Sequence, residues 1–292
     1  YKFLFLFLLI TVDINAKKHK RFKTHRAAAP TQRTKSEPSN QVRLIFTFDD
    51  GPAIQAELTP SVLETLERHH VHAVFFVNGM KIADPKKNYH ARELLEQTAQ
   101  AGHIIGNHTV NHYDLCSAKH GHKSRYEIQE SARLIEEVVG YAPPLLRIPF
   151  GRLKASPKAG FCEPLHSTMS ELQMSHTGWD VDAQEWRKKN STPEVTLGLI
   201  QAALLNFRRN PNHEIKIVLL HDTRAVTAAA LPKLLDWIEE ENKRCLRDKC
   251  PQFVIEDPLV LVTEDPKKSE ADWGEVFIKV LFYRLQDFLN PK

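Results

Sequence analysis

Short apolar runs and longer amphipathic stretches alternate along most of this chain, and the alternation constrains the fold more than any other feature. Runs of roughly four to eight apolar or β-branched residues indicate strands, and longer stretches with apolar residues at helical spacing indicate helices. Strands that alternate with helices form βαβ units with parallel pairing. The predicted strands are 43–48, 73–77, 104–107, 145–148, 175–182, 215–220 and 252–255.

This pattern predicts an α/β fold, a distorted or incomplete (β/α) barrel of about seven parallel strands in a single domain. The segment 151–173 has weak periodicity and is expected to wrap over the surface. The predicted helices are 60–70, 91–101, 124–139, 192–208, 227–244 and 273–289, the last docked on the core.

The charge of the chain is concentrated at its N-terminus. The net charge of the whole chain is +4, but residues 1–40 hold nine Lys or Arg and two Asp or Glu, so the remainder carries a net −3. A protein that binds nucleic acid usually carries its positive charge on the folded domain. We therefore expect no nucleic-acid partner.

The N-terminal segment has the pattern of a leader. The apolar run 3–12 is shorter than the roughly 20 residues that span a bilayer, and it fits the apolar region of a secretory signal ending near Ala16. An uncleaved anchor and a buried strand are the alternatives. Residues 17–40 are expected to be a disordered basic linker, either a spacer or a contact with an anionic cell envelope. The sequence thus predicts export to the periplasm, the envelope or the medium.

Four cysteines allow three disulfide pairings, and free buried thiols are the alternative. They are Cys116, Cys162, Cys245 and Cys250. The last two are close enough in sequence to clasp a local loop. The sequence does not decide between the pairings.

Two adjacent carboxylates, Asp49 and Asp50, end the first predicted strand within Thr-Phe-Asp-Asp-Gly-Pro. The carboxyl ends of parallel strands are where α/β folds place their ligands. Adjacent acids point in different directions, so one could hold a metal while the other accepts a proton. The alternative is a solvated turn, in which Asp, Gly and Pro are common.

Two histidines, His108 and His112, follow the third predicted strand. Residues four apart face the same way on a helix. Together with one carboxylate they would make a three-ligand zinc site that leaves a position for water. Because the chain has 15 histidines, a chance pair on the surface is the alternative.

Three more strand ends carry polar residues. Arg147 could orient a carboxylate and keep it ionised, or form a structural ion pair. Glu185 could pair with a cation and Trp186 could wall a pocket, or both could belong to a solvated turn over the core. His221 leaves a very apolar strand and could act as a general acid, or be a satisfied core histidine.

These five stretches, in this order, resemble the polysaccharide deacetylase (NodB-homology) family, carbohydrate esterase family four. The resemblance covers residues 42–255. It implies a catalytic domain at 41–265. The signal peptide or signal anchor expected at 1–16 and the linker expected at 17–40 precede this domain, and a helical extension is expected at 266–292. The stretches are 47–52, 108–112, 147–151, 182–186 and 219–222.

The resemblance also implies roles for the site residues. Asp49 matches the catalytic base, His221 the catalytic acid and Arg147 the residue that orients the base. Metal ligands match Asp50, His108 and His112.

Other positions depart from the family pattern or line the site. Glu185 stands where the family usually has Asp, and its extra methylene puts the support of the acid–base network in doubt. Asp182 fits the other acidic position. Phe150 stands where tyrosine is commoner, and its backbone N–H would help hold an oxyanion. Trp186 and Leu219 match residues that line the acetyl-methyl pocket.

The activity that the resemblance implies is the metal-dependent removal of N-acetyl groups from amino sugars of a polysaccharide, either peptidoglycan or a chitin-like polymer. The cofactor would be a divalent metal ion. Zinc fits the ligands, and Co²⁺, Ni²⁺ or Mn²⁺ would fit a similar site. An O-acetyl xylan esterase, a sugar deformylase and a non-catalytic carbohydrate-binding protein remain alternatives. The sequence gives no oligomeric state.

Overall fold

The computed structural model of the 292-residue chain describes residues 40–156, 160–187, 192–263 and 270–289. All of these belong to one compact unit, residues 38–292. The expected signal at 1–16 and linker at 17–40 lie outside the described residues, apart from Asn40, as does the expected boundary between 265 and 266. Within the described ranges, no helix is long and apolar enough to cross a membrane.

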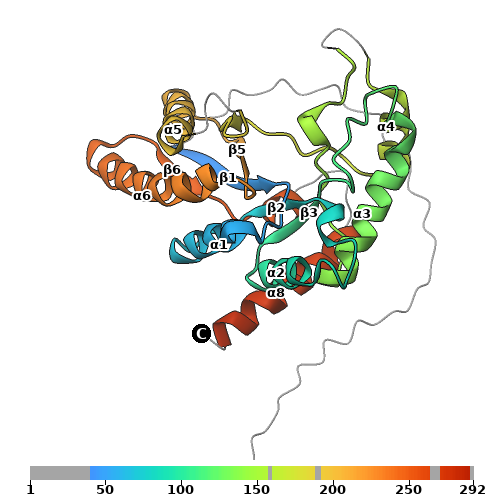
Figure 1. Cartoon of the computed structure of the whole chain (residues 1–292). Coiled ribbons are helices and arrows are strands. Elements are labelled where there is room, and N and C mark those ends of the chain that lie inside the picture. Colours follow the sequence, from blue (N-terminus) through green and yellow to red (C-terminus); the bar gives the residue numbers. More distant parts are fainter. Residues whose placement is uncertain (1–39, 157–159, 188–191, 264–269, 290–292) are drawn as a thin grey trace, which may run out of the picture. The chain divides into compact units, whose positions relative to one another are not determined.

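A parallel sheet forms the centre of this unit (Figure 1). Its described strands follow the order β3-β2-β1-β5-β4, and β6 pairs with the first residues of β1. All pairings are parallel. The strands are β1 Gln41–Asp49, β2 Val74–Val77, β3 Ile104–Asn107, β4 Val181–Asp182, β5 Ile215–His221 and β6 Gln252–Ile255.

The central strand β1 explains how the sheet positions polar residues. Its side chains are buried on both faces from Leu44 to Phe48, as expected for a parallel strand covered by helices on both sides. Its last residue, Asp49, lies beside Phe76 of β2 and His221 of β5 in the strand register. The strand ends that the sequence marked therefore meet at one rim.

Helices cover the sheet in two runs (Figure 1). Along one run α5 packs on α6 and α6 on α1, and along the other α8 packs on α2, α2 on α3 and α3 on α4. All six predicted helices are present, and α4 lies inside 151–173, where periodicity indicated none. The helices are α1 Leu58–Arg68, α2 Tyr89–Gln100, α3 Ser124–Val139, α4 Glu163–Glu171, α5 Pro193–Arg209, α6 Ala225–Asp248, α7 Val260–Thr263 and α8 Glu270–Leu289.

The expected seven-stranded barrel is not what strand pairing forms in the described residues. The predicted strand 145–148 is reduced to bridges from Leu146 to Asn107 and to His176, and only Val181 and Asp182 of the predicted strand 175–182 form a ladder. The reason is local. The N–H of Ile148 donates to the His176 imidazole instead of to a neighbouring backbone, and Pro149 has no N–H to donate.

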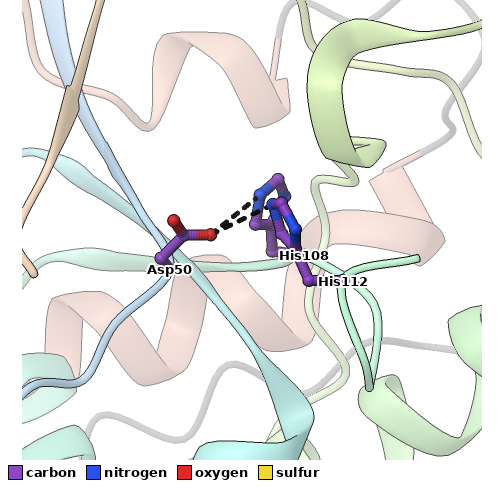
Figure 2. Close-up of side chains that lie close together, drawn as sticks. All are labelled: Asp50, His108 and His112. Carbon is purple, nitrogen blue, oxygen red and sulfur yellow. Dashed lines mark ion pairs between the residues drawn. The ribbon is translucent and has the colours of Figure 1, made fainter. Parts of the chain in front are cut away.

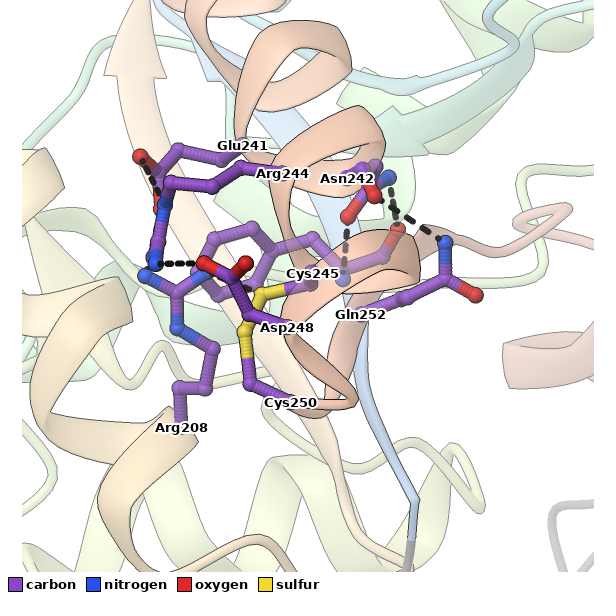
Figure 3. The surroundings of a disulfide bond; sticks show 9 residues. Arg208, Glu241, Asn242, Arg244, Cys245, Asp248, Cys250 and Gln252 are labelled. Carbon is purple, nitrogen blue, oxygen red and sulfur yellow. Dashed lines mark hydrogen bonds and ion pairs between the residues drawn. A yellow bond between two sulfur atoms is a disulfide. The ribbon is translucent and has the colours of Figure 1, made fainter.

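Both disulfides are formed, between Cys116 and Cys162 and between Cys245 and Cys250. The first ties the segment after β3 to the start of α4. The second joins the end of α6 to the residues before β6 (Figure 3). The sequence left the pairing open. The structure shows one disulfide between cysteines 46 residues apart and one between cysteines 5 residues apart.

Candidate functional site

The turn after β1 carries the two adjacent carboxylates. Asp50 has a φ of 74°, so the chain leaves the extended conformation of β1 directly after Asp49. A Cβ atom on Gly51 would lie 2.1 Å from the Asp222 carboxylate, so the turn has room only for glycine at this position. As a result Asp49 and Asp50 have different neighbours.

Asp50 faces both predicted histidines (Figure 2). Its Oδ1 atom lies 3.4 Å from Nε2 of His108 and 3.3 Å from Nε2 of His112. The three candidate ligand atoms lie within 4.8 Å of one another, and Asp50 Oδ1 is buried without a hydrogen-bond partner among the described residues. A cation between the three side chains would supply what that oxygen lacks, and two imidazoles with one carboxylate are a donor set that suits zinc.

The two histidines meet through a loop and not through the helix that their spacing suggested. Residues 108–112 are irregular, with φ values of 65° at Thr109 and 54° at His112. The Nδ1 atom of His108 lies 2.8 Å from the backbone oxygen of Arg147. Because a carbonyl oxygen only accepts, Nδ1 carries the proton there, and Nε2 is the ring nitrogen that could bind a cation.

Charges in this cluster are strongly coupled. Burial would raise the pKa of Asp50, but the nearby imidazoles of His108 and His112 outweigh it and hold that pKa well below its usual range. Burial would lower the pKa of His108, yet the carboxylates of Asp49 and Asp50 raise it. Burial dominates at His112 and lowers its pKa, which favours a neutral ligand.

Asp49 is held by a fully buried arginine. Arg147 Nη1 donates to Asp49 Oδ1 and to the Thr47 hydroxyl, each at 2.8 Å. Its Nε donates to the backbone oxygen of Thr177 and its Nη2 to that of Gly178, each at 3.0 Å. These bonds leave Asp49 Oδ2, which lies 3.7 Å from His108 Nε2, turned toward the cluster of Asp50, His108 and His112.

A second carboxylate holds the histidine at the end of β5. Glu185 Oε1 accepts from Nδ1 of His221 at 2.8 Å and from its backbone N–H at 2.7 Å. Burial lowers the pKa of His221, but the hydrogen bond and charge of Glu185, with the charges of Asp49 and Asp50, raise it to about 9. The longer Glu185 side chain therefore reaches His221 with the geometry that a supporting carboxylate needs.

The other predicted residues lie around this group. Asp182 Oδ1 accepts from the N–H of Gln184 at 2.9 Å and from Trp186 Nε1 at 3.2 Å, so it shapes its own turn. Trp186 is 43% exposed and Leu219 is buried beneath the rim. Phe150 is 62% exposed, with its ring centroid 4.7 Å from that of His112. The structure thus brings these side chains to one end of the sheet.

Sequence reasoning missed several residues that support the site. His176 accepts from the N–H of Ile148, and its burial, together with the charge of Arg147, lowers its pKa to about 4. Asp222 accepts from the Thr59 hydroxyl at 2.6 Å, and burial raises its pKa to about 7. Asp222 had a signal, since it follows His221 at a strand end. His176 had none beyond its place in a predicted strand.

The carboxyl rim of the parallel sheet carries three kinds of group: an Asp-His-His cluster, a carboxylate bound by an arginine and a histidine bound by a carboxylate. These are the groups of a hydrolase that activates water. The comparisons agree with this class. The family model for polysaccharide deacetylases matches residues 36–159. This chain belongs to the polysaccharide deacetylase family.

Named relatives are similar over the folded part of the chain. A peptidoglycan-N-acetylglucosamine deacetylase of Bacillus cereus is 30% identical over 215 residues, which cover 71% of this chain and 86% of that protein. The peptidoglycan-N-acetylglucosamine deacetylase PgdA of Listeria monocytogenes is 28% identical over 204 residues, which cover 68% of this chain but 36% of that protein. The chain therefore spans about a third of the length of the Listeria relative.

A solved structure has the same fold. The peptidoglycan deacetylase PdaC from Bacillus subtilis superposes with a TM-score of 0.54 at 25% identity, covering 81% of this chain and 96% of that chain.

Proposed function

We propose that this protein removes N-acetyl groups from amino sugars of a cell-wall polysaccharide, with peptidoglycan as the substrate polymer. The observation that carries the proposal is the convergence of Asp49, Asp50, His108, His112 and His221 at one rim of the sheet. The names of the relatives, which act on peptidoglycan N-acetyl groups, support this choice of polymer. An enzyme with this substrate works at the cell envelope.

Asp50, His108 and His112 would hold the divalent cation, with zinc as the expected ion. A bound cation of this kind polarises a carbonyl and makes its water more acidic. His108 would give up the proton that Asp49 and Asp50 favour in order to bind it.

Asp49 is the base in this proposal. The Arg147 ion pair fixes the orientation of Asp49, so its second oxygen can take a proton from the attacking water. The backbone N–H of Phe150 would help to hold the oxyanion.

His221 is the acid. Its raised pKa keeps it protonated near neutrality, and Glu185 holds Nδ1, so Nε2 can donate a proton to the leaving amine. Asp182, Trp186 and Leu219 shape the wall beside it.

The first experiment is an acetate-release assay on the purified protein. The substrates are N-acetylglucosamine oligomers, peptidoglycan and acetylated xylan, each after chelation and again after addition of zinc. We expect zinc-dependent release from peptidoglycan and a loss of about 10²–10⁴-fold in Asp49→Asn, with zinc binding retained. Full activity in Asp49→Asn would remove Asp49 from the role of base.

The same assay separates the alternatives. Release from xylan alone would keep the mechanism and make the protein an O-acetyl esterase. Formate released from an N-formylated sugar would indicate a deformylase. Glycan binding with no release from any substrate, with zinc bound, would indicate a non-catalytic carbohydrate-binding protein.

A further inference from the structure

The loop between the two histidine ligands needs support from outside itself. It runs from His108 to His112 without a helix, and Thr109 and His112 both have positive φ values. Such conformations are unfavourable for residues other than glycine, so the surrounding structure must hold them. The partners of the loop backbone show what does this.

Three consecutive backbone N–H groups of the loop donate to side chains. The N–H of Thr109 donates to Asn107 Oδ1 at 2.8 Å. Those of Val110 and Asn111 both donate to Glu127 Oε2, at 3.1 Å and 2.7 Å. Two of these three N–H groups therefore donate to a residue outside the loop, Glu127 on helix α3.

Both carboxylate oxygens of Glu127 accept hydrogen bonds from this loop. Its other oxygen, Oε1, accepts from the side-chain amide of Asn111 at 2.7 Å, so within the described residues all three donors to its carboxylate belong to the loop. The residue is fully buried, in the first turn of α3. Three donors and the positive end of the helix compensate a buried negative charge.

The opposite side of the loop is held through its carbonyl groups. The oxygens of Thr109 and Val110 accept from the backbone N–H groups of Gly79 and Met80, each at 2.9 Å. The loop is thus clamped between the segment after β2 and the carboxylate on α3. Removing Glu127 would release one side of this clamp and leave two N–H groups without an acceptor.

We propose that Glu127 is a positioning residue that holds the 108–112 loop in the conformation in which His108 and His112 both face Asp50. The inference rests on the proposed function, since it concerns the same metal site. Residues that orient metal ligands typically contribute about 10–100-fold to metal affinity.

The test compares zinc affinity in variants of the full chain. Apo protein competes with a chromophoric chelator for zinc, and hydrogen exchange reports on the amides of Val110 and Asn111. In Glu127→Leu we expect zinc to bind about 10–100-fold more weakly and both amides to exchange faster. Leu134→Ala, a buried truncation on the same helix, is the control. It should lower thermal stability and leave zinc affinity unchanged.

A charge exchange keeps the test decisive if Glu127→Leu does not fold. In Glu127→Gln, the new amide group faces the Asn111 amide, so we expect weaker zinc binding. Adding Asn111→Asp restores an acceptor for that amide, while the Gln oxygen still accepts both backbone N–H groups. The double variant should recover zinc affinity, and the cycle isolates the contact.

Three outcomes would overturn the inference: wild-type zinc affinity in Glu127→Leu, equal zinc affinity in Glu127→Gln and the double variant, or an equal loss in Leu134→Ala. Failure of the proposed function looks different. Wild-type protein that binds zinc but releases no acetate would contradict the function, and the dependence of zinc binding on Glu127 would still be measured.

Discussion

Two buried arginines lie at opposite ends of β1, and they differ in whether the partner carboxylate keeps an oxygen for another side chain. At the carboxyl end, Arg147 pairs with Asp49 and lies over the Phe76 ring at 4.2 Å. At the amino end, Arg208 pairs with Glu241 and lies over the Phe253 ring at 4.8 Å (Figure 3). Both are at most 9% exposed. Burial and pairing are thus similar at the two ends.

The difference lies in the partner carboxylates. Glu241 is bonded through both oxygens, because Arg244 donates to Oε1 at 3.2 Å and to Oε2 at 2.8 Å while Arg208 also binds Oε2. Asp49 uses Oδ1 for Arg147 and keeps Oδ2 toward His108. Of these two ion pairs, only the one at the carboxyl end leaves a carboxylate oxygen that faces another side chain, as a base requires.

The largest effect should come from removing each arginine in turn. Breaking a buried pair by removing one partner costs about 3–5 kcal/mol, so Arg147→Met and Arg208→Met should both lower the free energy of unfolding. Only Arg147→Met should lower kcat/KM, by about 10²–10⁴-fold, because its partner Asp49 is the proposed base and Glu241 has no proposed role in the reaction. Denaturant unfolding and acetate release at low temperature measure the two effects.

Arg147→Lys is the matched control, since it keeps the charge but loses the planar fork that binds Asp49 and the 177–178 backbone together. We expect it to remain folded with reduced activity. Equal activity losses in the Arg147 and Arg208 variants would break the comparison.

The sequence predicted the rim but not all of the contacts that complete it. Mostly apolar runs such as 42–48 identify buried parallel strands, and parallel strands place their ends together, so Asp49, His108 and His221 could be assigned to one site. The prediction of a strand at 145–148 was wrong because the Ile148 N–H donates to a side chain, and hydrophobic periodicity carries no information about such a bond. Glu127 went unrecognised because a buried glutamate on a helix looks like any solvated one in sequence.

Glu185 is a second carboxylate at the carboxyl rim that uses only one of its oxygens for its histidine partner, and the pH dependence of activity tests this pairing. Its Oε2 atom is buried and has no hydrogen-bond partner in the described part of the chain, while Oε1 holds His221. The raised pKa of His221 means that it stays protonated, and able to act as an acid, until the pH rises through about 9.

In Glu185→Gln the pKa of His221 should return to its ordinary value of about 6.5 or below, since burial then acts with less opposition. The alkaline limb of kcat should move to lower pH, and activity at pH 8 should fall about 30-fold from the loss of protonated His221. The pH dependence of acetate release measures this. An unmoved alkaline limb would assign the limb to a group other than His221.

The smallest effect should come from Glu241→Gln, at the amino end of the sheet. The hydrogen bond from Arg244, together with the hydrogen bond and charge of Arg208, outweighs the opposing effect of burial and lowers the pKa of Glu241 to about 2. A lowered pKa contributes stability above the ordinary value of about 4.5, and that contribution is lost as the pH falls through about 2.

Glutamine keeps one acceptor but loses the charge, so the variant should lose about 1.5 kcal/mol of unfolding free energy at neutral pH. Its stability should also fall less steeply than that of the wild type between about pH 4.5 and 2. Urea unfolding across that pH range measures both, and kcat/KM should not change, because both Glu241 oxygens are committed to arginines far from the rim. A change in kcat/KM without a change in stability would mean that the amino end of the sheet is coupled to the site, and the contrast between the two arginines would no longer hold.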